Sequence, residues 1–313
     1  MTFEITEPIL VIGLGRVGAE LAEKAKKSLN SDSLVISHDQ KDLTDKNSIK
    51  ISTKSVVNPS IHLIRGSTLE NLEEIKKNIS KYSTIILMSN LAGKAGIGIA
   101  PVVSKICKEQ EKNLLSFAIM PFKFEKDRIF QSGIALKRIR HDSHCTIVLD
   151  NDALLDSNPD LSHEQCNDIS NKAIESVISS LKSSEISEDV NILSTSKNAS
   201  DMEVSLKDSL RMLYEDAPPN SIKRSMLYVY GGSNVPIGVL NSISDITGGV
   251  FDENTTHVDM SSNESKIVML SSVQGEIKFD KYDPLGIISS EKTIDWDEPE
   301  CSINCELDLK QLE

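Results

Sequence analysis

The sequence predicts an α/β protein in which a parallel sheet covered by helices on both sides is followed by a smaller α+β domain. Short apolar runs alternate with amphipathic stretches from Pro8 to Leu149, a pattern typical of strand–helix units whose strands pair in parallel. Beyond Leu149, strand and helix patterns continue without glycine-rich turns at the strand ends, which is typical of a separate α+β unit.

Length and composition restrict the class of protein. A chain of 313 residues usually forms two domains, and a hydrophobic content of 39% supplies cores for both. The net charge of −13 and the aromatic content of 4% argue against a nucleic-acid partner. The five scattered cysteines are expected to be free thiols. No signal pattern follows Met1 and no run of 18 apolar residues occurs, so we expect a cytoplasmic protein without direct membrane insertion.

The first glycine motif follows the first buried strand. Pro8–Ile12 is apolar, the segment Gly13-Leu-Gly15-Arg16-Val17-Gly18 comes next, and Ala19–Leu29 has a helical pattern. This is G-x-G-x-x-G between a strand and a helix, where backbone N–H groups can receive phosphate. Asp39 follows about 20 residues after the turn, as in NAD-binding Rossmann domains, so an NAD-dependent enzyme is one alternative.

The remaining elements follow from periodicity and breaker residues. Further strands are expected at Ser33–Ser37, Ile61–Ile64, Thr84–Met88, Leu114–Ile119, Cys145–Leu149, Met226–Tyr230, Thr256–Met260 and Lys266–Val273. Further helices are expected at Thr68–Lys81, Val102–Gln110, Phe130–His141, Ser162–Ser184, Ser200–Glu215 and Ile237–Ile246. The polar segments Gln40–Pro59 and Ser183–Asn198 are expected to be loops.

A second glycine-spaced turn, Leu91–Pro101, follows the strand that ends near Met88. Gly93, Gly96 and Gly98 would let the backbone approach an anionic phosphate at the start of the next helix. The sequence therefore predicts two phosphate-receiving turns at the ends of two strands.

Several segments in a fixed order carry a resemblance to a known family. They are Ala100–Val103, Pro121–Glu125, Arg128 and Asn151–Leu155. Together with the first glycine turn, they resemble the tubulin superfamily, most closely its prokaryotic member FtsZ, from about Pro8 to Gly275. The resemblance implies a Rossmann-like nucleotide-binding domain at residues 1–161, a central helix at 162–184, a C-terminal α+β domain at 185–288 and an acidic tail at 289–313.

The resemblance also implies a site for GTP or GDP, with which a Mg²⁺ ion is compatible. Ribose and phosphate contacts would come from Glu125 and Arg128, and guanine contacts from Asp168 beside Asn167. An exposed ion pair and an ordinary helix carboxylate are the competing interpretations. The phosphate-binding residues would be Gly13, Gly15, Arg16, Val17, Gly18, Gly93, Lys94, Ala95, Gly96, Ile97 and Gly98.

Departures from the family pattern affect phosphate binding and hydrolysis. Lys94, Ala95 and Ile97 replace one glycine and two threonines of the second turn, and Ala19 replaces an asparagine. Lys94 would either meet the phosphates as a point charge or point into water. The loop after the central helix lacks the family's carboxylate pattern. Asp189 is the candidate catalytic residue there, with Glu185 or Glu188 as possible substitutes for the missing carboxylates, and hydrolysis is expected to be weak or absent.

The resemblance implies head-to-tail self-association into filaments, with cell division as the associated process. The tail around Trp296 would either be disordered or dock on a protein partner or membrane tether. A scaffold that keeps the fold without nucleotide is the second alternative.

Overall fold

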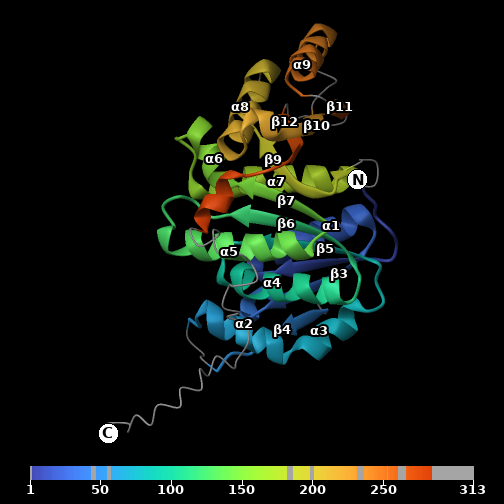
Figure 1. Ribbon diagram of the computed structural model, residues 1–313, viewed down its shortest axis with the longest axis vertical. Helices are drawn as coiled ribbons and strands as arrows, with labels where there is room; N and C mark the ends of the chain where they lie inside the picture. Colours follow the sequence, from blue (N-terminus) through green and yellow to red (C-terminus); the bar gives the residue numbers. More distant parts are fainter. Residues whose placement is uncertain are drawn as a thin grey trace.

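The computed structural model describes residues 2–43, 47–54, 58–181, 186–197, 201–230, 236–251, 253–259 and 266–283. A ten-stranded sheet crosses the described chain in the order β11-β10-β12-β9-β7-β6-β5-β2-β3-β4, and a small sheet pairs β1 with β8 (Figure 1). The strands are β1 (Thr2–Phe3), β2 (Ile9–Leu14), β3 (Asp32–Ser37), β4 (Ser48–Lys50), β5 (Thr84–Asn90), β6 (Asn113–Met120), β7 (Cys145–Asp150), β8 (Ile186–Ser187), β9 (Asp189–Thr195), β10 (Ile222–Tyr230), β11 (Glu253–Asp259) and β12 (Lys266–Val273).

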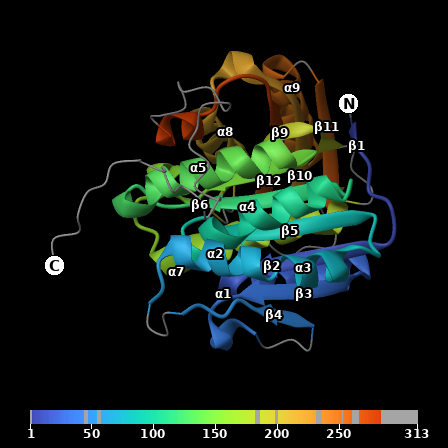
Figure 2. The ribbon, with the colours of Figure 1, turned by 60° about the horizontal axis from the view of Figure 1, so that its bottom comes forward.

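Helices cover both faces of this sheet (Figure 2). The helices are α1 (Gly15–Leu29), α2 (Ile61–Glu70), α3 (Leu72–Ile79), α4 (Lys94–Glu109), α5 (Lys126–Asp142), α6 (Asn151–Ser157), α7 (His163–Ser180), α8 (Met202–Asp216) and α9 (Ile237–Val250), with short 3₁₀ turns η1 (Gln40–Asp42), η2 (Pro219–Ser221) and η4 (Lys278–Tyr282). Apolar residues of α1 and α7 lie in one core, and those of α4 and α5 lie in the other. The predicted α/β fold is therefore confirmed.

Alternating side chains of the central strands explain why both faces are buried. In β2, Ile9 and Val11 enter the core beneath α1 and α7, whereas Leu10 and Ile12 enter the core beneath α4. Successive side chains of a strand point to opposite faces, so a continuous apolar run fits a strand covered on both sides. All pairs from β4 through β7 to β9 are parallel, as the alternation of strands and helices predicts.

Two predicted elements near residue 60 are wrong. Ile61–Ile64 is the start of α2 instead of a strand, and Ser60 caps that helix by accepting from the N–H of Leu63 at 3.3 Å. The predicted loop Gln40–Pro59 contains β4, which extends the sheet beyond β3.

Helix α4 begins at Lys94, well before the predicted start at Val102, and continues through Pro101. Proline has no N–H, so the carbonyl of Ile97, four residues earlier, loses its usual donor. The guanidinium of the buried Arg65 donates to that carbonyl at 3.3 Å. Arg65 therefore explains how α4 tolerates an internal proline.

The C-terminal half extends the same sheet. The predicted loop Ser183–Asn198 contains β9, which pairs in parallel with β7, so a loop is wrong for residues 189–195. Strand β12 then pairs antiparallel with both β9 and β10. Figure 1 shows β9–β12 with α8 and α9 at one end of the molecule and β3 and β4 toward the other. The division into domains at 161, 184 and 288 stays a prediction.

The helix predicted at Ser162–Ser184 is α7. Ser162 and Gln165 form a capping box at its start, and α7 packs against α1 and β9. Residues 182–185 lie outside the described residues, and β8 follows directly, pairing with β1. The segment Gly231–Ser233 and the tail with Trp296 also lie outside the described residues. No helix in the described ranges has the length and apolarity needed to span a membrane.

A buried ionic cluster joins the end of β7 to α8 and η4. The ammonium of Lys278 lies 2.5 Å from Asp150 and 3.3 Å from Asp216, and both carboxylate side chains have 0% exposure. Burial, and then the neighbouring Asp150 carboxylate, raise the pKa of Asp216 well above its ordinary value of 3.8. Two carboxylates thus share one lysine.

We expect the free energy of unfolding to fall as the pH rises through the raised pKa of Asp216. The folded-state pKa lies above the unfolded one, so the stabilisation from the protonated carboxyl is complete below the ordinary value of 3.8 and is lost through the folded-state pKa. Urea unfolding at a series of pH values checks this, with Asp216→Asn expected to remove this contribution. Asp245→Asn, on the exposed side of α9, is the control. Identical pH profiles for wild type and Asp216→Asn would contradict the expectation.

Candidate functional site

The two glycine turns lie side by side at the carboxyl ends of adjacent strands. Strand β2 pairs in parallel with β5, and Leu14 is opposite Ser89. From β2 the chain continues through α1 to β3 on one side, and from β5 it continues through α4 to β6 on the other. The order of strands reverses between β2 and β5, and open α/β sheets bind ligands at such a switch point.

The first turn closes tightly on its own backbone. A Cβ on Gly13 would lie 2.3 Å from the carbonyl oxygen of Gly18, and Gly15 has φ +65°. Both positions therefore require glycine for the local geometry. Arg16 is exposed and pairs with Glu20 at 3.2 Å, and Val17 packs partly against the core.

The second turn touches the first. A Cβ on Gly15 would lie 2.9 Å from the Cβ of Ala95. A Cβ on Gly96 would lie 2.1 Å from the carbonyl oxygen of Asn90, and one on Gly98 would lie 2.9 Å from Ile64. Ala95, Gly96, Ile97 and Gly98 are all buried in α4, and Gly93 and Lys94 form the partly exposed part of the turn.

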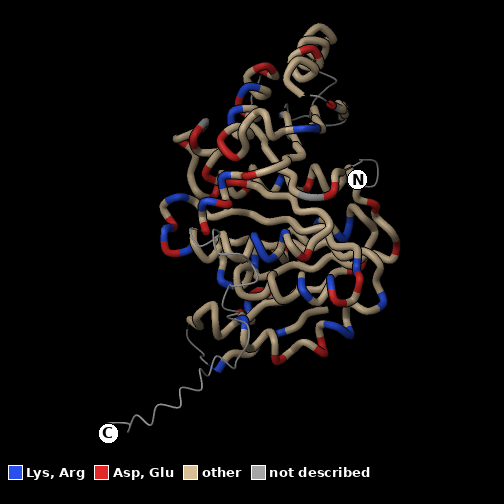
Figure 3. Tube along the Cα trace, viewed as in Figure 1, with Lys and Arg blue, Asp and Glu red and all other residues tan. Residues whose placement is uncertain are grey.

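Neither helix start has a side-chain cap among the described residues. Leu14 is the N-cap of α1 and Gly93 is the N-cap of α4, and neither residue has a side-chain atom that could accept a hydrogen bond from its helix. The first N–H groups of a helix have no partner within the helix and carry partial positive charge. Figure 3 shows basic and acidic residues interspersed over the described chain, so attraction for an anion at this edge has to be local. Two such helix starts in contact suit a polyphosphate.

The structure gives the ammonium of Lys94 two protein partners at the start of α4, and its contact with phosphate stays a prediction. The ammonium donates to the side-chain oxygen of Asn58 at 2.7 Å and to the carbonyl oxygen of Pro59 at 2.8 Å. Lys94 therefore ties the start of α4 to the segment that leads into α2.

The Glu125–Arg128 pair lies next to the second turn. The two side chains form an ion pair at 3.2 Å, and Arg128 also donates to the carbonyl of Ala92. Glu125 accepts from the backbone N–H of Phe122 at 3.2 Å. The structure brings this pair to the turn, and its contacts to ribose or phosphate stay a prediction.

Asn167 and Asp168 have different surroundings on α7. The carboxylate of Asp168 is exposed and pairs with Lys172 at 3.3 Å. The side chain of Asn167 lies 3.4 Å from the amide nitrogen of Asn151 and 3.1 Å from His163. Asn167 is thereby joined to the Asn151–Leu155 motif at the end of β7, and Asp168 faces solvent.

Sequence reasoning missed a group of rings beside these residues. Phe124 has 68% exposure and stacks on the buried Phe122, with ring centroids 5.3 Å apart. His163 is the first residue of α7, and its ring centroid lies 5.1 Å from that of Phe122. The sequence Pro121–Glu125 marks the two phenylalanines, but His163 lies about 40 residues later and only the fold brings it there.

The candidate catalytic residue lies at the opposite edge of the sheet. Asp189 begins β9 and pairs with Cys145, the first residue of β7, whereas the glycine turns follow the last residues of β2 and β5. In parallel strands, first and last residues lie at opposite edges. Asp189 and the glycine turns of one chain are therefore not in one site.

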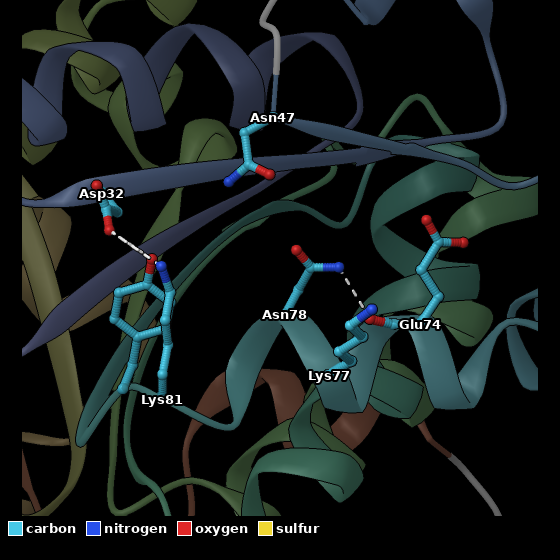
Figure 4. A pocket seen from close by; sticks show the side chains of 7 residues that line it. Asp32, Asn47, Glu74, Lys77, Asn78 and Lys81 are labelled. Atoms are coloured by element: carbon cyan, nitrogen blue, oxygen red, sulfur yellow. Dashed lines mark hydrogen bonds and ion pairs between the residues drawn. The ribbon is translucent and has the colours of Figure 1, made fainter.

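A polar hollow, about 470 Å³ in volume, is also distant from the glycine turns. Figure 4 shows its lining, which comes from the first residue of β3, from Asn47 and from α3 and the residues after it. Tyr82 donates to Asp32 at 2.5 Å, and Lys81 lies 3.8 Å from the same carboxylate. The lining has charges of both signs, so it indicates no particular ligand. In the described ranges, no group of three or more His, Cys, Asp or Glu residues could hold a metal ion.

Comparison with known proteins gives a consistent result. Residues 28–159 match the GTPase domain of the tubulin/FtsZ family. The chain is 30% identical over 165 residues to cell division protein FtsZ 2 of Halobacterium salinarum, covering 49% of this chain and 41% of that protein. The matched segment thus spans less than half of that relative.

Solved structures with similar folds cover more of the chain. An empty FtsZ dimer from M. jannaschii superposes with a TM-score of 0.68 at 15% identity, covering 89% of this chain and 92% of that one. A GTPγS-bound protofilament of CetZ2 from Haloferax volcanii superposes with a TM-score of 0.66 at 13% identity, covering 90% and 99%. At these identities the superpositions concern the fold.

Proposed function

We propose that this chain, which belongs to the tubulin/FtsZ family, binds GTP or GDP at the contact between its two glycine turns and assembles head to tail. The observation that carries the proposal is the meeting of two uncapped helix starts at a switch point, where Gly15 and Ala95 touch. Glu125 and Arg128 on one side of the turns would hold the ribose and the adjacent phosphate, and Asn167 with Asp168 would meet the base.

Assembly follows from the separation of the two edges. Asp189 lies at the amino edge and the glycine turns lie at the carboxyl edge, so Asp189 would reach a nucleotide only on a neighbouring copy. A head-to-tail contact between unlike surfaces repeats into an open filament. A cytoplasmic filament with a role in cell division, tethered through the acidic tail, belongs to the same proposal.

Hydrolysis is proposed to be weak or absent. The connection between the C-cap of α7 and the start of β9 consists of residues 182–188. Two of them, Ile186 and Ser187, form β8 and pair with β1. Little chain is therefore left for a loop that presents several carboxylates to the next copy. Phosphoryl transfer depends almost entirely on positioning, and displacement of the catalytic groups by about 1 Å costs roughly a hundredfold in rate.

Nucleotide binding and turnover can be measured on the purified chain. We expect guanine nucleotide to co-purify or to bind in titration, and light scattering to rise on addition of GTP. We expect phosphate release roughly a hundredfold or more below that of an active FtsZ measured in parallel. Binding of NAD in place of GTP would revive the dinucleotide alternative. Assembly without any bound nucleotide would favour the scaffold.

The Asp189→Ala variant tests separately whether Asp189 contributes to GTP hydrolysis. If residual phosphate release depends on the edge-to-edge contact, this variant should lose it and keep GTP binding. Brisk phosphate release that survives Asp189→Ala would contradict the assignment of Asp189.

A further inference from the structure

We infer that Lys94 reads the terminal phosphate of the nucleotide and thereby sets a preference for the triphosphate over the diphosphate. The inference rests on the proposed nucleotide site and assigns it a residue that distinguishes two forms of its ligand. Lys94 is the first residue of α4, next to Ala95, which touches the first glycine turn.

The order of residues along the carboxyl edge gives the nucleotide a direction. Glu125 and Arg128 follow β6, and Asn151 with Asn167 lie beyond them at β7 and α7. The ribose and base are assigned to these elements, on the β6 side of the glycine turns. A phosphate chain that starts there and crosses the turns must end on the opposite side, toward β3.

The ammonium of Lys94 lies on that opposite side. It is held by Asn58 and Pro59, which precede α2, and not by any residue of β6 or β7. His38, directly after β3, is close enough to the Lys94 ammonium for its positive charge to affect the pKa of His38. Burial lowers the pKa of His38, the carboxylates of Asp39 and Asp42 oppose this, and the Lys94 ammonium adds to the lowering. A Cβ on Gly15 would lie 4.0 Å from the Asp42 carboxylate, so the first turn and this group of side chains adjoin.

The chemistry of the ammonium fits a terminal phosphate. An ammonium has three N–H donors, and the contacts of Lys94 within the described residues use two of them. The third can donate to a phosphate oxygen, and the positive charge favours the extra negative charge of a triphosphate. Ala95 and Ile97, the neighbours of Lys94 in the turn, have no hydroxyl that could do the same. Lys94 is therefore the side chain of the second turn that can tell the two nucleotides apart.

The same contacts connect the phosphate to a second helix. Pro59 is followed by Ser60, the N-cap of α2, and α2 packs on α4 through the close approach of Ile64 to Gly98. A phosphate bound by Lys94 would fix the ammonium against Asn58 and Pro59 and so stabilise the start of α2.

The test measures the affinities for GTPγS and GDP by calorimetric titration of wild type, Lys94→Met and Lys94→Arg. We expect Lys94→Met to lose roughly tenfold or more in affinity for GTPγS and to bind GDP within about twofold of wild type. Lys94→Arg, which keeps the charge, should recover part of the preference. Lys41→Met removes an exposed lysine at the same edge of the sheet and should change neither affinity.

An unchanged ratio of GTPγS to GDP affinity in Lys94→Met would overturn the inference, whether both affinities stay at the wild-type values or both fall equally. If thermal stability also falls while the ratio stays unchanged, Lys94 only ties the start of α4 to Asn58. If the wild-type chain binds neither nucleotide, the proposed function itself fails and the inference fails with it. A variant that still binds GDP separates these cases.

Discussion

Replacement of Gly96 by alanine is expected to remove nucleotide binding and to lower the free energy of unfolding by about 1–3 kcal/mol. The added Cβ would lie 2.1 Å from the carbonyl oxygen of Asn90 and 2.7 Å from its carbonyl carbon. Both are backbone atoms, so the start of α4 has to move away from the end of β5. The displaced segment includes Gly93 and Ala95, and the contact with Gly15 would open.

Gly66→Ala is the matched control for this substitution. Gly66 lies inside α2, and a Cβ added there would meet no atom within 4 Å. Alanine at an unstrained helix position should stabilise the protein by roughly 0.5–1 kcal/mol. Urea unfolding and GTP titration of both variants separate the effect of the clash from that of the added methyl group. Wild-type GTP affinity in Gly96→Ala would show that the second turn is not the phosphate site.

The central strands could be predicted from the sequence because their signal is local. Runs such as Ile85–Met88 and Leu114–Ile119 are apolar at almost every position, which is typical of a strand buried on both faces. The glycine turns were predicted for the same reason, since Gly13 and Gly15 follow such a run directly.

The missed elements depend on distant parts of the chain. The sequence of β9 contains polar residues such as Asn191 and Ser194, but these side chains are buried because β9 lies inside the sheet, between β7 and β12, and is covered by α7 and α8. The four residues Ile61–Ile64 are too few to distinguish a strand from a helix by their pattern. The Ser60 cap and the packing of α2 on α4 stabilise the helix.

The candidate site divides in the same way. Its glycines could be located from the sequence, but the partners of its charged side chains could not. Lys94 meets Asn58, which lies 36 residues away, and Arg128 meets the carbonyl of Ala92, also 36 residues away. Sequence spacing alone contains no information on such contacts. From the sequence, the side chain of Lys94 could therefore only be expected either to contact the phosphates or to point into water.

Replacement of Lys278 by methionine is expected to lower the free energy of unfolding by about 3–5 kcal/mol. Asp150 and Asp216 would then be fully buried with no cation beside them in the described structure. One oxygen of Asp216 already has no hydrogen-bond partner among the described residues, so the loss cannot be absorbed locally. Lys281→Met, at an exposed position of the same 3₁₀ turn, should change stability by less than about 0.5 kcal/mol.

A combined variant tests whether uncompensated charge is the cause. Lys278→Met together with Asp150→Asn and Asp216→Asn removes all three charges and should recover much of the stability lost by Lys278→Met alone, because neutral groups cost less to bury than unpaired carboxylates. If the triple variant is as unstable as Lys278→Met, packing of the lysine stem and not its charge holds η4 against α5. If Lys278→Met unfolds like wild type, the cluster does not join α8 and η4 to β7. In that case the C-terminal strands depend on the pairing of β9 with β7 and on apolar packing alone.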